Sequence, residues 1–280
     1  MFNLRLLTEQ EVRNGLLHLL TYKPFTQTTD FVNSLGGAST WTTDTVTVKI
    51  GSYPRNEGAY EAAVVTRDGS IVKRNLGFLE GIRPAVKFSE IEKICKNLRF
   101  DELGIGYAEY GEYPQSKVKE NKKLDEKLEK GSLQETKRTY TIVDRKYRNT
   151  FNEPFCPWLG RFEVNHKNPF IKLKEYRDET GNKYVKNGND WYKVEPLVWR
   201  IDTKKDIAIT EKIINNGTHI GGDYSIKNYL KNYLAKDITR TRKSKVRVTR
   251  INLENVDKDT VINKNVTELG ICQKQKVKSK

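Results

Sequence analysis

Apolar residues recur along the first part of the chain in patterns that indicate short helices and strands. Thr8 and Glu11 form a capping box, and the leucines after them predict a helix over residues 8–20. Residues 41–50 alternate between apolar and polar side chains, which predicts a half-buried strand with Val46 on its apolar face. The Thr-, Ser- and Gly-rich stretch between these two elements predicts a loop.

A β-hairpin is predicted next, from two apolar runs at residues 59–66 and 70–73. The Asp68-Gly69 pair between them is a strong turn signal, because glycine adopts a positive φ without steric cost. Residues 81–86 predict an extended segment, since the residue before a proline is pushed toward the β region.

Two helices are predicted from caps followed by apolar residues. Ser89 caps a short helix that carries Ile91, Ile94 and Leu98. Asp223 caps a longer amphipathic helix. Its apolar face, at helical spacing, consists of Ile226, Tyr229, Leu230, Tyr233 and Leu234.

The middle of the chain has a different pattern. Residues 116–138 are rich in Lys and Glu, and they predict a mostly solvated helix that ends at Gly131. This helix is the best candidate for an exposed arm or a domain linker. Residues 139–195 hold short aromatic-rich runs separated by turn signals, which is typical of a β-meander, and strands follow at 197–201 and 206–210. The sequence therefore predicts a β-rich α+β fold with a few short amphipathic helices.

The positive charge is unevenly distributed along the chain. The formal net charge is +15, and it divides into zero for residues 1–110, +7 for 111–235 and +8 for 236–280. With the element pattern, this predicts a neutral N-terminal α+β unit, a basic α+β unit over 111–238 and a basic tail over 239–280. A field of this size attracts polyanions, although a lysine-rich composition also serves solubility without any partner.

The densest positive charge gives one candidate for a binding site. Nucleic acid or another polyanion is a candidate partner of the C-terminal region, and binding there would be largely independent of sequence, because no helix-turn-helix or RNP pattern is present. The candidate polyanion-binding residues are Arg240, Arg242, Lys243, Lys245, Arg247 and Arg250.

Composition limits the remaining classes of protein. Apolar residues make up 36% of the chain, so its cores are expected to be thin and to depend on aromatic side chains. No apolar run reaches the ~20 residues that a membrane-spanning helix needs. The N-terminus lacks the pattern of a secretory signal, so we expect a cytoplasmic protein without membrane contact.

Two sequence motifs in the second half suggest a family. Residues 110–115 (Tyr-Gly-Glu-Tyr-Pro-Gln) and 194–201 (Val-Glu-Pro-Leu-Val-Trp-Arg-Ile), followed by the strand at 207–210 and the helix from 225 to 233, resemble uncharacterised bacterial and phage proteins. Those proteins are similar to the C-type-lectin-like fold of formylglycine-generating-enzyme-like domains and phage tropism proteins. The resemblance implies a β-rich C-type-lectin-like core here.

The first half resembles the C-terminal part of the same domains, which often ends in Gly-Val-Arg-Pro-Ala. The matching segments are the hairpin at 59–72 and Gly-Ile-Arg-Pro-Ala at residues 81–85. The two halves thus stand in swapped order, as in a permuted domain or in two incomplete units that complete each other. The residues that carry the motifs are Trp41, Arg83, Pro84, Tyr113, Pro114 and Trp199.

No catalytic or metal-binding set is visible in the sequence. The three cysteines and three histidines are scattered, at Cys95, Cys156, Cys272, His18, His166 and His219. Their spacing gives neither a zinc site nor the thiol pair of a formylglycine-generating enzyme. Glu195-Pro196 lacks the Asn of a calcium-dependent sugar site, and Asn189-Asp190 is more typical of a turn. We therefore expect no metal and no cofactor.

These observations favour a non-enzymatic binding or structural protein, of phage or low-GC bacterial origin, that acts through a protein-docking surface. Its expected location is the host cytoplasm, or a virion if a phage encodes it. The alternative is a nucleic-acid-binding protein that uses the basic C-terminal region, for example a phage inhibitor of a nucleic-acid-guided host defence complex. An enzyme of an unrecognised class is the third hypothesis.

Overall fold

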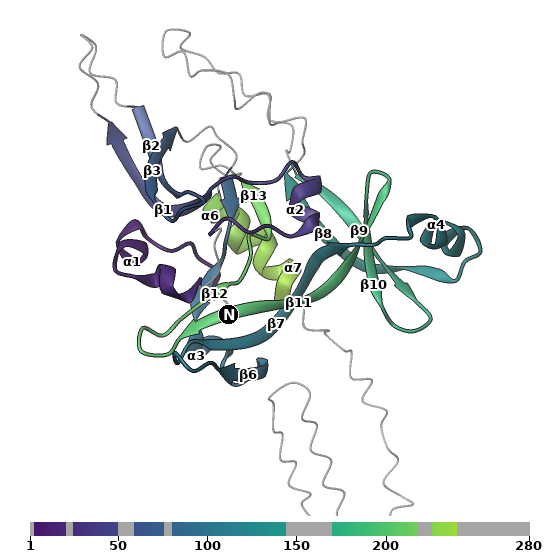
Figure 1. The fold of residues 1–280 in the computed structure, drawn as a ribbon. Helices are drawn as coiled ribbons and strands as arrows, with labels where there is room; N and C mark the ends of the chain where they lie inside the picture. The colour runs from purple at the N-terminus through teal and green to yellow at the C-terminus, as the bar shows by residue number, and fades with distance from the viewer. Residues whose placement is uncertain are drawn as a thin grey trace, which may run out of the picture. The chain divides into compact units, whose positions relative to one another are not determined.

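The computed structural model describes residues 3–20, 25–49, 59–75, 80–143, 170–217 and 226–239, which belong to one compact unit. Within them the fold is β-rich α+β, as the sequence predicts (Figure 1). The strands are β1 Trp41–Lys49, β2 Ala59–Val65, β3 Ile71–Asn75, β4 Glu80–Ile82, β5 Ala85–Lys87, β6 Lys96–Phe100, β7 Gly106–Lys117, β8 Leu133–Val143, β9 Phe170–Asp178, β10 Lys183–Asn187, β11 Asp190–Asp202, β12 Ile207–Thr210 and β13 Asn215–Gly217.

The helices of the described residues are short. They are α1 Glu9–Arg13, the 3-10 helix η1 Leu16–Leu19, α2 Asp30–Ser34, α3 Phe88–Ile91, α4 Asn121–Glu129, α6 Ile226–Tyr229, the π-helical turn η5 Leu230–Leu234 and α7 Ala235–Thr239. None of these helices is long and apolar enough to cross a membrane.

The strands form two sheets. The smaller sheet has the order β13-β4-β1-β2-β3, and the larger follows β5-β12-β11-β10-β9-β8, with β7 paired to β11 and β6 paired to β7. The predicted meander is confirmed, because β8, β9, β10 and β11 are antiparallel neighbours in chain order. The predicted hairpin is β2–β3, whose turn has Gly69 at φ +90°.

Two segments pass from one sheet to the other side by side, and we name this place the sheet crossing. The first segment is residues 80–87, with β4 in the smaller sheet and β5 in the larger. The second is residues 207–217, with β12 in the larger sheet and β13 in the smaller. β5 pairs with β12 and β4 pairs with β13. The first half of the chain thereby completes both sheets together with the second half.

The expected boundary between residues 110 and 111 falls inside a strand. β7 runs continuously from Gly106 to Lys117 and pairs with β11 along much of its length. Stretches 1–110 and 111–238 both contribute strands to the larger sheet. The basic stretch 239–280 lies outside the described residues except for Thr239.

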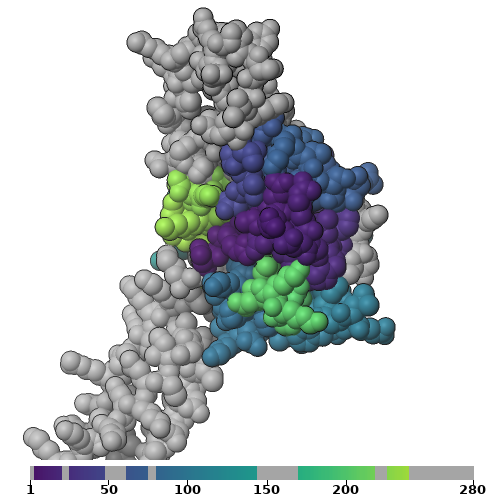
Figure 2. Space-filling model, turned by 90° about the vertical axis from the view of Figure 1, so that its left-hand side faces the viewer, coloured from purple at the N-terminus to yellow at the C-terminus, as the bar shows by residue number. Residues whose placement is uncertain are grey.

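The N-terminal residues pack between the sheets. The capping box of Thr8 and Glu11 is present, but α1 ends at Arg13, and a left-handed Gly15 starts η1. Figure 2 shows these purple residues covering one face, next to the green turn between β11 and β12. Lys205 of that turn donates a hydrogen bond to the carbonyl of Asn14 at 3.0 Å.

The predicted amphipathic helix is confirmed from Ile226 onward as the run α6–η5–α7, whereas its expected cap, Asp223, lies outside the described residues. Ile226, Tyr229, Leu230 and Leu234 are buried in the main core, and Tyr233 packs against that core from its edge. The expected solvated helix is α4, and Gly131 follows it at φ +73°. It is docked, because Leu124 and Trp191 share a small separate core under it.

Two predictions about local structure are wrong. Ser89 does not cap a helix through Leu98: α3 begins at Phe88 after Lys87 and ends at Ile91, and the chain then forms β6. The apolar spacing suited a helix, but pairing with β7 took the segment into the sheet. Val46 is also exposed on β1, since this end of the strand extends beyond the core.

Candidate functional site

The arginine of the Gly-Ile-Arg-Pro-Ala motif is a structural tie at the sheet crossing. Its buried guanidinium donates hydrogen bonds to three main-chain carbonyls, those of Thr210 (2.8 Å), Phe25 (2.7 Å) and Glu211. Burial lowers the pKa of Arg83 to about 9, so the group keeps its charge at neutral pH. Arg83 therefore fastens the bend between β12 and β13.

The neighbouring motif residues complete this tie. The Trp41 ring is buried with the Arg83 guanidinium 5.8 Å from its centroid, a cation–π distance. The carbonyl of Pro84 accepts a hydrogen bond from Thr210 N at 3.0 Å. A second buried arginine, Arg200, lies 3.9 Å from the Tyr107 ring centroid and pairs with the Glu211 carboxylate at 2.5 Å.

The other motif residues fix the β7–β11 pair. Tyr113 and Trp199 are fully buried, and Trp199 Nε1 donates to the carbonyl of Tyr110 at 2.8 Å. Pro114 lies opposite Val194 in the ladder. All six motif residues are thus part of the framework, and none is presented to solvent as a catalytic or binding group.

A buried polar network joins the C-terminal helices to the sheets. The Tyr229 hydroxyl donates to the carbonyl of Thr141 at 2.6 Å and accepts from the Asn215 amide, which also lies 2.7 Å from the Tyr113 hydroxyl. Asp237 accepts from Thr141 N at 2.7 Å. Burial raises the pKa of Tyr229 and Tyr113 well above the ordinary value, so neither phenol is poised as a base.

Next to this network the carboxylates are paired with cations. Arg138 donates to Glu112 at 3.0 Å and lies 3.6 Å from the buried Glu175. Lys183 also binds Glu112, and the Tyr140 hydroxyl donates to Glu175 at 2.8 Å. Burial alone would raise the pKa of Glu112, but Lys183 and Arg138 outweigh it and hold the pKa below its usual value. The cluster is a fixed ion network rather than an acid–base pair.

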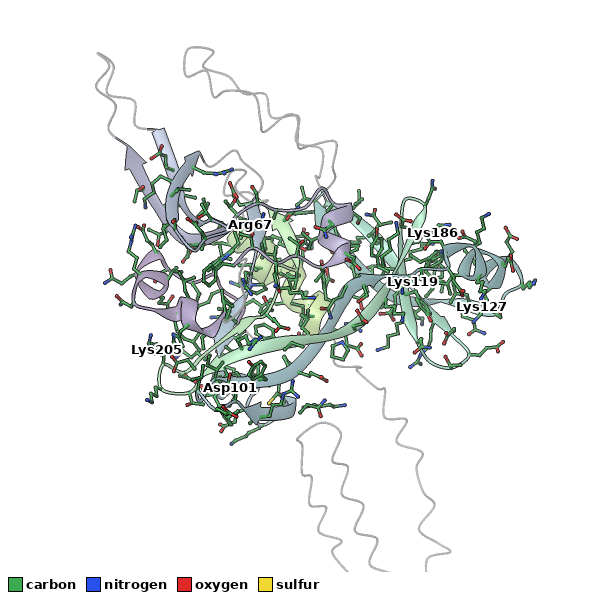
Figure 3. The ribbon with its side chains drawn as sticks, in the orientation of Figure 1. Arg67, Asp101, Lys119, Lys127, Lys186 and Lys205 are labelled. Carbon is green, nitrogen blue, oxygen red and sulfur yellow. The ribbon has the colours of Figure 1, made fainter. Side chains whose placement is uncertain are left out.

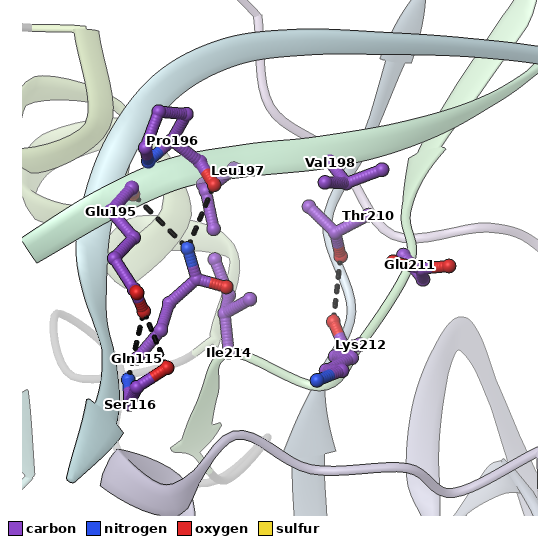
Figure 4. A pocket seen from close by; sticks show the side chains of 10 residues that line it. All are labelled: Gln115, Ser116, Glu195, Pro196, Leu197, Val198, Thr210, Glu211, Lys212 and Ile214. Carbon is purple, nitrogen blue, oxygen red and sulfur yellow. Dashed lines mark hydrogen bonds between the residues drawn. The ribbon is translucent and has the colours of Figure 1, made fainter.

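A pocket of about 260 Å³ lies along β11, between β7 and the end of β12 (Figure 4). Its polar groups largely bind one another. Gln115 donates to the carbonyls of Glu195 (3.0 Å) and Pro196 (2.8 Å), and the Glu195 carboxylate accepts from Ser116 N and Oγ. The Thr210 hydroxyl donates to the carbonyl of Lys212. Ser116 and Glu195 join a hydroxyl to a carboxylate, but no histidine or cysteine is among the described residues that line the pocket.

The single histidine and cysteine of the described residues do not form a site. His18 is half exposed and lies 3.6 Å from Asp202. Cys95 is a free thiol whose pKa is raised by burial, so it is not an activated nucleophile. Asp190, in the predicted turn, binds Lys117 and Asn121. The described part of the chain contains no group of three or more His, Cys, Asp or Glu placed to hold a metal ion.

Most of the excess positive charge lies outside the described residues. These carry 32 Lys and Arg against 27 Asp and Glu, a net +5, whereas residues 240–280 carry 12 against 4. Within the fold, Lys119, Lys127 and Lys186 gather around α4 (Figure 3), where Lys186 is paired with Asp125. The candidate polyanion-binding residues all lie outside the described part: Arg240, Arg242, Lys243, Lys245, Arg247 and Arg250.

The clearest surface feature is one that the sequence analysis missed, and we name it the β6 edge, residues 94–103. Among the described strands β6 is paired with β7 alone, and all five of its residues are exposed. Four large apolar side chains of this segment are solvent-accessible: Ile94 by 54%, Leu98 by 40%, Phe100 by 51% and Leu103 by 80%. Assigning Ile94 and Leu98 to a helix hid the feature, although the spacing of Leu98 and Phe100 fits a strand.

A shallow hollow adjoins this edge. Its volume is about 370 Å³, and its lining includes Leu98, Arg99, Tyr107 and Val198. The Arg99 guanidinium lies 5.4 Å from the Tyr107 ring centroid, so the cation is held against the sheet. In Figure 3 the labelled Asp101 marks this end of the β7–β11 pair, opposite the end that carries α4.

Comparison of the chain with protein-family models, with curated proteins and with solved structures gave no match. The site must therefore be interpreted from its own chemistry.

Proposed function

We propose that this chain is a non-enzymatic binding protein with a C-type-lectin-like core in permuted order, and that it acts by docking a polypeptide at the β6 edge. Two lines of support come from different parts of the fold. One is the way the motif residues are used, and the other is the surface left exposed.

The permuted core is supported by the sheet crossing. The segment resembling the end of the lectin-like domains, residues 80–87, pairs with residues 207–217, which follow the segments resembling their beginning. Arg83 binds the main chain of Thr210 and Glu211 across that junction. This pairing is what a domain with its halves in swapped order would need in order to form one unit.

The docking role is supported most directly by the exposed apolar side chains of the β6 edge. Large apolar groups gathered in one exposed segment mark interaction surfaces, and an edge strand offers free main-chain groups as well. Apolar residues make up only 36% of the chain, so few are available beyond those that the core needs. The β6 edge nevertheless leaves four of them in water, whereas the polar groups of the pocket bind one another.

The test is affinity capture from the organism that encodes the chain, at high salt, with the wild type and two variants. The first variant combines Leu98→Asp and Leu103→Asp, and the control is Val46→Asp, at a position 42% exposed on β1. We expect the same polypeptide to be recovered by the wild type and the control and lost by the double variant. Equal recovery by all three would contradict docking at the β6 edge.

Nucleic-acid binding is the second candidate, and one observation favours it: residues 240–280 alone carry a net +8. We expect that affinity for nucleic acid would then fall steeply between ~50 and ~200 mM salt. A truncation must end after Thr239, because Asp237 and Ile238 are buried. Unchanged binding after that truncation, or no retardation at low salt, would exclude the C-terminal residues as the binding site.

A further inference from the structure

Three asparagines of this chain are followed directly by glycine: Asn14, Asn187 and Asn216. Such a pair can lose ammonia without an enzyme, because glycine has no side chain to hinder attack by its main-chain nitrogen on the asparagine amide. The attack requires a glycine N–H that is not held in a hydrogen bond and an asparagine side chain that can turn toward it. The structure places the three pairs in different surroundings, so their reactivity should differ in the folded protein.

The pair with the freest glycine nitrogen is Asn187-Gly188, at the turn between β10 and β11. The hairpin closes with Asn187 opposite Asp190, and Gly188 is exposed with φ +61°. Among the described residues the main-chain nitrogen of Gly188 donates no hydrogen bond. The side chain of Asn187 is half-buried, and Nδ2 donates one hydrogen bond, to Ser34 Oγ at 2.9 Å.

The other two pairs are held by the fold. At the end of α1, Gly15 N donates to the carbonyl of Val12 at 3.2 Å, so this nitrogen is already engaged. Asn216 and Gly217 are both buried in β13, where Asn216 Nδ2 donates to the carbonyl of Gly37 at 3.1 Å. Reaction at either pair requires local opening of the structure first.

We propose that Asn187 is a site of spontaneous deamidation in the folded protein. The main-chain nitrogen of Gly188 forms a bond to Cγ of Asn187, and the bond from Cγ to Nδ2 breaks. The proton of the Gly188 nitrogen leaves with the amide as ammonia, and a succinimide ring remains. Water, the only co-reactant, then opens the ring at either carbonyl and gives aspartate or isoaspartate.

The isoaspartate product alters the hairpin. Its main chain runs through the side-chain carbons, which adds one atom to the backbone after Asn187 and disturbs the pair with Asp190. The same hairpin carries Tyr184 and Trp191, which belong with Leu124 to the small core under α4. The modification should therefore loosen the docking of α4.

The first test uses the full wild-type chain, incubated at neutral pH both folded and in concentrated urea. Peptide mapping by mass spectrometry measures the fraction of each of the three asparagines that becomes an acid over time. In urea the three should react within about twofold of one another, because only the local sequence then acts. In the folded chain Asn187 should react at least about fivefold faster than Asn14, the factor that one hydrogen bond contributes, and Asn216 should be slowest.

The second test connects the modification to α4. Trypsin cleaves after the lysines of α4, so its rate there reports how firmly the helix is docked. The deamidated fraction, separated by its extra negative charge, should be cleaved in α4 at least about threefold faster than the unmodified chain. Asn187→Gln is the matched control, since glutamine must close a larger ring and reacts far more slowly. Incubated alongside, this variant should gain no cleavage in α4.

Each measurement can overturn one part of the proposal. Conversion of Asn14 as fast as that of Asn187 in the folded chain overturns the choice of site. Conversion of all three asparagines at their urea rates overturns the role of the fold. Cleavage in α4 that does not rise with deamidation, or rises equally in Asn187→Gln, overturns the loosening of α4. These experiments use the chain by itself, so their outcome is independent of docking at the β6 edge.

Discussion

The sheet crossing and the β6 edge each contain one arginine that contacts an aromatic ring, and the two arginines differ in burial and in hydrogen bonding. Arg83 is buried, and its guanidinium donates hydrogen bonds to three main-chain carbonyls. Arg99 is exposed, and among the described residues its guanidinium lies against the face of Tyr107. The first arginine is committed to the fold, whereas the second remains available to another molecule.

The same contrast extends to the apolar residues of the two regions. At the crossing, Ile82, Ala85 and Val86 are fully buried. At the β6 edge, Leu98 and Phe100 remain accessible to water. This difference shows that the motif residues of the chain belong to its folded core. A candidate docking surface has to be looked for elsewhere, at an edge strand of the sheet.

The largest effect is expected at Arg83. Arg83→Met should lower the free energy of unfolding by about 4 kcal/mol, because three buried carbonyls lose their donor at once. Arg83→Lys should not rescue it, since one ammonium cannot reproduce the planar fork. Urea denaturation measures the change, with exposed Arg67→Met as control. A loss below 1 kcal/mol would mean that the crossing does not depend on this tie.

The next effect tests how closely the C-terminal helix approaches β7. Gly111 has φ +71°, and a Cβ there would overlap Ile238 Cγ2 and lie 3.0 Å from the Ile238 carbonyl oxygen. Gly111→Ala should cost about 3 kcal/mol. Gly104→Ala is the matched control, since Gly104 has φ +76° and nothing within 4 Å of the added Cβ, so only the backbone cost of about 1 kcal/mol remains. Similar losses in both variants would contradict the close approach.

A smaller loss is expected from the buried network. Tyr229→Phe removes the donor to the Thr141 carbonyl and the acceptor for the Asn215 amide, and should cost about 1–2 kcal/mol. Tyr233→Phe, on the same helical run but half-buried, should change stability little. Thermal unfolding of both variants makes the comparison, and an equal shift would show that the Tyr229 hydroxyl is not the group that matters.

These framework effects bear on what a sequence can reveal. The caps, turns and alternation of the chain predict the β2–β3 hairpin, the meander and the final helical run, because each of these is governed by local chemistry. The crossing could not be derived in this way. It depends on pairing between β4 and β13, which are far apart along the chain, and no local pattern encodes that pairing.

The candidate site was missed for a related reason. Ile91, Ile94 and Leu98 fit a helical spacing, and the alternative, a strand beginning at Lys96, becomes favourable only once β7 supplies a partner. The residues singled out by resemblance proved structural, from Trp41 to Trp199. The sequence alone does not show whether an apolar side chain is exposed or buried, because that depends on which strands and helices pack against it in the fold.

A pH series can sharpen the contrast at the crossing. Burial raises the pKa of Glu80 above the ordinary glutamate value of about 4.5, so the folded state binds the proton more tightly than the unfolded state. The stability from this group is full below about pH 4.5 and is lost as pH rises through the folded pKa. Glu80→Gln should abolish that decline, so its advantage over the wild type should grow with pH. A constant difference across the series would contradict the assignment.

The smallest effect on the free energy of unfolding is expected at the β6 edge. A small effect there is informative, because it would separate a role in binding from a role in folding. Leu98→Asp and Leu103→Asp should each change the free energy of unfolding by less than about 0.5 kcal/mol in the isolated protein, because both side chains already contact water. Combined, the same substitutions should remove the captured polypeptide in the affinity experiment. A residue that contributes to binding but not to folding is a docking residue. A loss of 2 kcal/mol or more in the free energy of unfolding would instead show that the β6 edge is needed for the fold.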